Sequence, residues 1–313
     1  MTLAVVVPLL AYTALERRAA RVRQALGLRA PGWRSRLELA AALMSVAVLL
    51  GLAAAQPVLA WAHDQAARGD AEVMFAFDVS KSMQASLGPN GTTRLGRAKS
   101  LAVKLRATLG DIPAGIATMT DRTLPHLFPS ANAEVFNTTV HEAFAIENPP
   151  PSSLGGPTGG RATTLGALAV VATEGYFTPG VQHRLLVVLS DDESLPFESS
   201  SVGAVFRKPP RVHTIFVRFW NRRERVYRAD GKPDVFYRPD PTSAQTALTL
   251  AEATRGRTFG ENDLRSIVKA ARTDLGSGAI RRRRLERART PIAGWLAFAA
   301  ILPLGLILRR RSL

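Results

Sequence analysis

Hydrophobic residues between Ala71 and Gly276 follow two alternating patterns. Short, nearly continuous apolar runs such as EVMFAFDV and HRLLVVLS are typical of strands that are covered on both faces. In RLGRAKSLAVKLRATLG, apolar residues recur every three or four positions, which predicts a helix that Thr92 or Thr93 can cap and that Gly110 ends. Strands that alternate with helices predict an α/β domain with a Rossmann-like, doubly wound, mainly parallel sheet and helices on both faces.

The same reading places the remaining elements of this domain. Further strands are predicted at AGIATMT and RVHTIFVRFW, and helices at AEVFNTTVHEAFAI, TLGALAVVATEG, TSAQTALTLAEATRG and NDLRSIVKAARTDL. The composition of PPPSSLGGPTGG is typical of a loop. NRRERVYR is interpreted as a solvated hairpin or loop, and contact with anionic lipid headgroups is the alternative if the domain lies close to a membrane.

Three apolar stretches lie outside this domain, and a membrane span is considered for each. The stretch 39–62 carries no charge and is long enough to cross a hydrocarbon layer about 30 Å thick. The stretch 291–308 has Arg on both sides, and the stretch 1–15 is a shorter, possible span; a buried soluble helix is the alternative for each. The predicted order is a possible transmembrane segment 1–15, a basic loop 16–38, a transmembrane helix 39–62, the α/β domain 71–276, a basic linker 277–290, a transmembrane helix 291–308 and a basic tail 309–313.

The distribution of positive charge predicts how the chain crosses a membrane. Seven Arg residues lie in the loop 16–38, which the positive-inside rule places in the cytoplasm. The α/β domain is then expected outside the cytoplasm, anchored to the inner or plasma membrane. The run from Arg281 to Arg284 argues for the opposite orientation, because it is as basic as the tail.

Composition changes this picture little. The chain has 41 Lys and Arg against 25 Asp and Glu, a formal charge of +16, but only six of the basic residues are Lys. The Arg residues gather beside apolar segments, and no nucleic-acid reader motif is present, so a nucleic-acid partner is not expected. The absence of Cys excludes disulfides, thiolate zinc sites and Cys nucleophiles.

Oxygen-bearing side chains follow two of the predicted strands. Asp78 ends the run VMFAFD, with Ser80 and Ser82 after it, and Asp191 ends LLVVLS. If these strands are neighbours, both carboxylates meet at the carboxyl edge of the sheet, where Thr163 and Thr164 can add hydroxyls. Oxygen ligands without His or Cys suit a hard cation such as Mg²⁺, Mn²⁺ or Ca²⁺. The alternative for D-x-S-x-S alone is a turn after a strand.

These motifs together resemble the von Willebrand factor A (VWA) domain and its metal-ion-dependent adhesion site (MIDAS). DVSKSM is similar to the first motif of that family, ATTLGAL to its threonine motif and LLVVLSDDES to its last motif. The resemblance covers about 71–275. It implies five metal ligands, with Thr164, Asp192 and Glu193 near the site: Asp78, Ser80, Ser82, Thr163 and Asp191. Asp192 stands where the family usually has Gly, and because Asp tolerates a positive φ better than most residues, we expect the turn to be retained.

The whole layout also resembles the bacterial membrane-anchored Bat (aerotolerance-type) proteins. That resemblance implies a role with MoxR-type AAA+ ATPases in the assembly or chaperoning of envelope proteins. The main hypothesis is therefore a membrane-anchored, non-enzymatic domain whose metal binds an Asp or Glu of a protein partner. The alternatives are a metal-dependent hydrolase that uses the same cation, with Asp191 or Glu193 as base, and a structural membrane protein with an unoccupied site.

Overall fold

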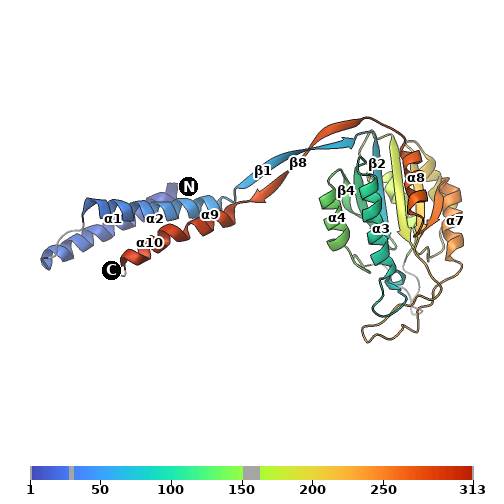
Figure 1. The fold of residues 1–313 in the computed structure, drawn as a ribbon, viewed down its shortest axis with the longest axis horizontal. Helices are drawn as coiled ribbons and strands as arrows, with labels where there is room; N and C mark the ends of the chain where they lie inside the picture. The colour runs from blue at the N-terminus through green and yellow to red at the C-terminus, as the bar shows by residue number, and fades with distance from the viewer. Residues whose placement is uncertain (1, 28–31, 151–162, 312–313) are drawn as a thin grey trace. The chain divides into compact units, whose positions relative to one another are not determined.

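The structure is a computed structural model that describes residues 2–27, 32–150 and 163–311 (Figure 1). Contacts within the chain divide it into two units, one made of Met1–His63 with Glu286–Leu313 and the other of Asp64–Leu285. The predicted loop segment at 151–160 lies outside the described residues.

The unit Asp64–Leu285 contains the predicted α/β domain. Within the described residues, six strands form its sheet in the order β4-β3-β2-β5-β6-β7. The strands are β2 (Ala71–Asp78), β3 (Ala114–Met119), β4 (Thr123–Ser130), β5 (His183–Ser190), β6 (Val212–Arg218) and β7 (Arg257–Gly260). All pairings are parallel except that of β3 with β4, so the predicted mainly parallel sheet is confirmed.

Burial explains why the central strands read as continuous apolar runs. Every residue of β2 is buried, because helices cover both faces of the sheet. Phe75 and Phe77 pack toward α3 (Arg94–Thr108), α4 (Ala133–Glu142) and α8 (Leu264–Leu275). Met74 and Ala76 pack on the other face, where α5 (Ala169–Thr173), α6 (Ser199–Arg207) and α7 (Ser243–Thr254) lie. The helix α3 is capped by Thr93, whose side chain accepts a hydrogen bond from the Gly96 N–H.

The other unit contains the N-terminal and C-terminal helices. These are α1 (Thr2–Ala25), α2 (Trp33–Ala54), α9 (Ala293–Ala299) and α10 (Ile301–Arg311). Within the described residues, one helix is long and apolar enough to cross a membrane: its span Leu37–Ala54 has a mean hydropathy of 2.2. The apolar helix Ala293–Arg309 is shorter. The predicted possible span 1–15 lies in α1, which continues to Ala25 through several Arg residues.

Two predicted boundaries differ from the structure. The helix predicted at 39–62 ends at Ala54, because Pro57 follows closely and Gln56 has a φ of 47°, which no helix allows. The residues after Pro57 belong to β1 (Val58–Arg68), which pairs with β8 (Ile280–Pro291) in a two-stranded sheet. Most of the segment 277–290, expected as a linker, is therefore a strand.

Candidate metal site

The two strands that end in Asp78 and Asp191 are neighbours. β2 pairs with β5 in parallel, with Phe77 opposite Leu189, so both acids leave the sheet at its carboxyl edge. Both side chains are fully buried. The condition on which the predicted meeting of the two carboxylates depended, that these strands are neighbours, is therefore met.

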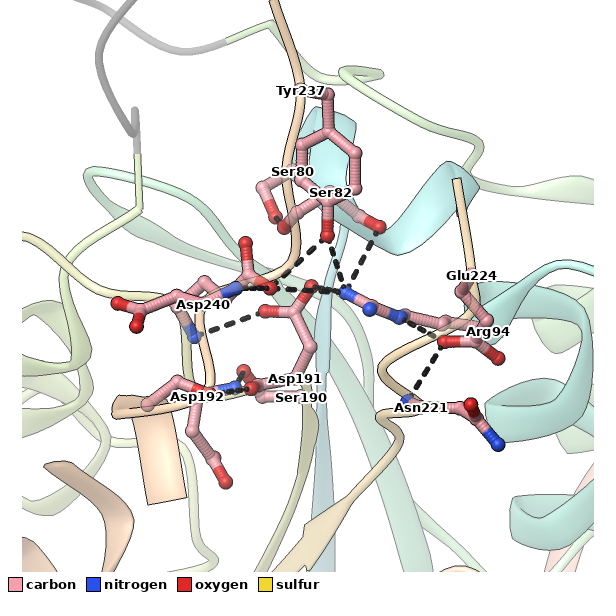
Figure 2. A network of polar contacts seen from close by, with 12 residues as sticks. Ser80, Ser82, Arg94, Ser190, Asp191, Asp192, Asn221, Glu224, Tyr237 and Asp240 are labelled. Carbon is pink, nitrogen blue, oxygen red and sulfur yellow. Dashed lines mark hydrogen bonds and ion pairs between the residues drawn. The ribbon is translucent and has the colours of Figure 1, made fainter. Parts of the chain in front are cut away.

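The serines of the first motif lie on the tight turn that follows β2. The Ser80 N–H donates to Asp78 Oδ1 at 2.9 Å, which fixes the carboxylate against the turn. A 3-10 helix over Lys81–Gln84 then brings Ser82 beside Ser80, with 2.9 Å between the two Oγ atoms (Figure 2). Two hydroxyls and a carboxylate thus come together within five residues of the chain.

Thr163 and Thr164 have different roles in the structure. Thr163 is buried, and its Oγ1 donates to Asp78 Oδ1 at 3.4 Å. Thr164 instead caps the short helix Leu165–Leu168, since its Oγ1 accepts from the Gly166 N–H at 3.3 Å. Thr163 is therefore the threonine at the sheet edge.

Ser190 is a polar contact of the site that was not among the predicted ligands. Its Oγ donates to Asp78 Oδ2 at 2.7 Å and accepts from the Asp192 N–H at 2.9 Å. Asp192 has a φ of 63°, so the turn expected at this position is retained. Its side chain is buried, and neither carboxylate oxygen has a hydrogen-bond partner in the described residues; Arg218 Nε lies 3.7 Å from Oδ2.

Two buried acids at one edge make the ionised state of Asp78 costly. Burial and then the charge of Asp191 raise the pKa of Asp78 to about 7. Burial and then Asp191 also hold the pKa of Asp192 well above its usual range. A bound cation would relieve this repulsion, and the donors present are oxygens only. No cluster of three His, Cys, Asp or Glu side chains suited to a metal occurs in the described part of the chain, so a cation here depends on the hydroxyls.

Arg94 completes the electrostatics of the edge, and sequence reasoning did not identify it. Its buried guanidinium donates from Nη1 to Asp191 Oδ2 at 2.7 Å and from Nε to Glu224 Oε2 at 2.6 Å (Figure 2). Nη1 also lies 2.8 Å from the Tyr237 hydroxyl oxygen. Nothing in the sequence distinguishes Arg94 from the other arginines of this chain, so the pattern alone gave no signal for it.

Glu193 and Glu224 are both part of this network. Glu193 Oε1 accepts from Arg94, from the Tyr237 hydroxyl at 3.0 Å and from the Asp240 N–H at 3.1 Å. Burial and then Asp191 raise the pKa of Glu193. Glu224 lies within NRRERVYR, and the prediction that this segment is solvated is wrong for it: its side chain is buried against Arg94 and Arg97.

Comparison with known proteins bears on the fold. No family model matches the chain, and no curated protein matches its sequence. BatB from Bacteroides thetaiotaomicron, a conserved hypothetical protein, matches with a TM-score of 0.50 and 19% identity over 66% of this chain and 100% of that one. An aerotolerance-related membrane protein from Bacteroides fragilis matches with a TM-score of 0.48 and 19% identity over 66% and 98%. Mussel byssus proximal thread matrix protein 1, in a form with a zinc-occupied MIDAS motif, matches with a TM-score of 0.44 and 14% identity over 78% and 54%. At this identity the BatB match shows the fold alone, and it confirms that the α/β domain resembles Bat proteins in fold.

Proposed function

We propose that the α/β domain binds a protein partner through a divalent cation held at the carboxyl edge of its sheet. One observation carries this proposal: oxygen-bearing side chains from three separate segments converge there. The distances are 2.9 Å between the Ser80 and Ser82 hydroxyls and 3.4 Å from Thr163 Oγ1 to Asp78 Oδ1. Asp191 follows β5, which is the neighbour of β2, and completes the set of five candidate ligands. These are Asp78, Ser80, Ser82, Thr163 and Asp191.

The chemistry of the donors favours a hard cation, Mg²⁺, Mn²⁺ or Ca²⁺. Hydroxyl ligands are neutral, and at most two carboxylates of this chain would hold the divalent ion. The ion would therefore keep a strong attraction for a further carboxylate. An Asp or Glu of a partner is the side chain that provides one. The cation would thus act as the contact point between two proteins.

A hydrolase that uses the same cation is the less favoured alternative. Hydrolysis needs a base positioned to take a proton from water. Glu193 Oε1 already accepts from Arg94, Tyr237 and the Asp240 N–H. Asp191 Oδ2 accepts from Arg94. Because these groups are held by internal donors, we propose a non-enzymatic role.

The helix α2 supports a membrane-anchored form of this function. Its 18-residue apolar span and the similarity in fold to BatB fit a domain that acts at the inner membrane, outside the cytoplasm. By its resemblance to Bat proteins, the chain would act in envelope-protein assembly or chaperoning together with a MoxR-type ATPase system.

Metal-dependent partner capture tests the proposal. The full chain in detergent is immobilised and exposed to a membrane extract with Mg²⁺ or with EDTA. We expect a protein that is retained only with Mg²⁺, that a Ser82→Ala variant fails to retain, and that a Ser100→Ala variant retains. Ser100 is an exposed serine of α3. Equal retention by wild type and Ser82→Ala, or with and without Mg²⁺, would contradict the proposal.

A further inference from the structure

The loop between β6 and α7, residues 219–242, contains an open groove with a cavity volume of about 800 Å³. We call this segment the basic loop. Three arginines line the groove together with proline rings and Tyr237: Arg222, Arg225 and Arg238.

Several contacts hold the basic loop at the edge of the sheet where the candidate ligands lie. Lys81, between the two serines of the first motif, pairs with Asp234 at 2.8 Å. The backbones of Ser86 and Arg225 exchange two hydrogen bonds of 2.9 Å. The Tyr237 hydroxyl donates to Glu193 at 3.0 Å, and Tyr237 itself lines the groove. The groove and the candidate metal site therefore share one face of the domain.

The charges of the basic loop are divided unequally between its inside and its surface. Its acids bind inward or within the loop: Glu224 pairs with Arg94 and Arg97, Asp234 with Lys81, and Asp230 with Arg228. Asp240 Oδ1 accepts from the Thr242 N–H and hydroxyl.

The groove arginines, in contrast, have no carboxylate partner among the described residues. Arg225 Nη1 donates only to backbone carbonyl oxygens of its own loop. Arg222 and Arg238 are exposed at the surface. Their charge is therefore available to an outside anion.

Two large apolar side chains of the basic loop are exposed to solvent. Val235 is 74% exposed and lines the groove, and Phe236 is 93% exposed. An aromatic residue next to Arg is the composition typical of protein interfaces, where aromatic and Arg side chains contribute most of the binding energy.

We propose that the basic loop binds an acidic segment of the protein partner, one that carries an apolar side chain beside its carboxylates. This inference rests on the proposed function, because the segment would flank the carboxylate that reaches the cation. Charge complementarity selects the acidic residues, and Val235 and Phe236 select the apolar one.

An anionic lipid surface is the other source of negative charge. The basic loop contacts the first motif through the Lys81–Asp234 pair, beside the candidate ligands, and this favours the partner segment that would flank the cation.

The test measures peptide binding by the full chain in phosphatidylcholine nanodiscs. The probe is a short fluorescein-labelled glutamate peptide with a central leucine, and its all-glutamine counterpart is the control. The loop variant carries R222Q, R225Q and R238Q. A matched variant with the same loss of charge, K104Q, K208Q and R265Q, removes exposed cations elsewhere on the domain. Since Arg225 also donates to loop carbonyls, an R222Q/R238Q double variant replaces the triple variant if that one misfolds.

We expect the loop variant to bind the acidic peptide about tenfold more weakly, because three ion pairs of modest strength are lost. We expect the matched variant to bind it within about twofold of wild type. Phe236→Ser should weaken the leucine-containing peptide more than one without leucine. Equal weakening in the loop and matched variants would overturn the proposal. The proposal would also be overturned if wild type bound phosphatidylglycerol vesicles but not the peptide, and the loop variant lost the vesicle binding.

A separate readout distinguishes this inference from the proposed function. Mn²⁺ binding is measured on the same samples by electron paramagnetic resonance. The loop variant should keep wild-type Mn²⁺ affinity. If wild type binds no Mn²⁺ but its peptide binding depends on the basic loop, the proposed function is contradicted and the inference about the groove is supported. If wild type binds Mn²⁺ and the loop variant binds the peptide as tightly as wild type does, the inference about the groove is contradicted and the proposed function is not.

Discussion

The buried guanidinium of Arg94 lies between carboxylates from two separate segments of the chain. It contacts Asp191 and Glu193 after β5 and Glu224 in the basic loop, at 2.7, 3.3 and 2.6 Å. Buried acids without a paired charge are strongly destabilising, and Arg94 is the cation that all three acids share at this edge. The same contacts hold the basic loop against the motif that follows β5.

Replacing this guanidinium should destabilise the domain. We expect Arg94→Gln to lower the free energy of unfolding by about 3–5 kcal/mol, because it leaves the buried acids Asp191 and Glu193 without their cation and Glu224 with Arg97 alone. Arg97→Gln is the control, since the Arg97 side chain is 25% exposed and pairs with Glu224 and Glu261. Urea unfolding followed by circular dichroism measures both. A cost for Arg94→Gln no larger than that for Arg97→Gln would contradict this role.

The raised pKa of Asp78 predicts a pH dependence of stability. Without metal, the folded state holds the Asp78 proton up to a pKa of about 7, whereas the usual value is 3.8. This contribution to stability is therefore complete below about pH 4 and is lost as the pH rises through about 7. It amounts to at most about 4 kcal/mol.

The Asp78→Asn variant isolates this effect. In EDTA, the difference in unfolding free energy between about pH 4.5 and about pH 7.5 should be smaller in the variant than in wild type. Thermal unfolding at both pH values measures it, with Glu252→Ala as a control at an exposed acid of α7. Parallel pH profiles for wild type and Asp78→Asn would show that Asp78 is ionised in the folded state.

Hydrophobic pattern predicted the central elements and missed the edge strands. β2 and β5 are buried on both faces, so their apolar runs are unmistakable. β4 is an edge strand with two prolines and several half-exposed residues, and β7 has only four residues, so neither carries a periodic signal.

Three sequence-local motifs located the candidate site residues. Arg94, Glu224 and Tyr237 escaped because their contact depends on how a long loop returns to α3.

The packing of α6 on α7 depends on a glycine. A Cβ at Gly203 would meet the backbone carbonyl of Ala253, which cannot move without shifting α7. We expect Gly203→Ala to cost about 1–3 kcal/mol of unfolding free energy, as over-packing does elsewhere. Gly88→Ala is the matched control, because a Cβ there meets no atom within 4 Å. Chemical unfolding compares the two, and an equal cost would contradict the close approach of the helices.

At the scale of the whole chain, an apolar helix accompanies a domain of the Bat fold. A span at 39–62 was predicted from its lack of charge, but its end was placed too late because apolar residues continue into β1. Composition alone does not separate an apolar helix from an apolar strand. The ribbon formed by β1 and β8 was missed for a related reason, since the Arg-rich sequence of β8 has no strand-like hydrophobic pattern.

Charges in the middle of α2 should reduce membrane integration. Ser45 and Val48 are exposed positions near the centre of the span. Each Arg there should cost about 2.5–3.5 kcal/mol of insertion free energy. The Ser45→Arg/Val48→Arg variant should therefore lose at least half of the carbonate-resistant membrane fraction, and Ser45→Ala/Val48→Leu should keep it. Equal membrane fractions for the two variants would contradict a span at α2.

Calorimetric titration of the full chain with Mg²⁺ and Mn²⁺ measures whether the carboxyl edge of the sheet binds a cation. Wild type should bind one ion per chain. Asp78→Ala should lose this binding because the carboxylate at the centre of the site is gone, and Glu252→Ala should keep it. Ion binding that is the same in wild type and Asp78→Ala, or no binding by wild type, would contradict a cation site at the carboxyl edge of the sheet.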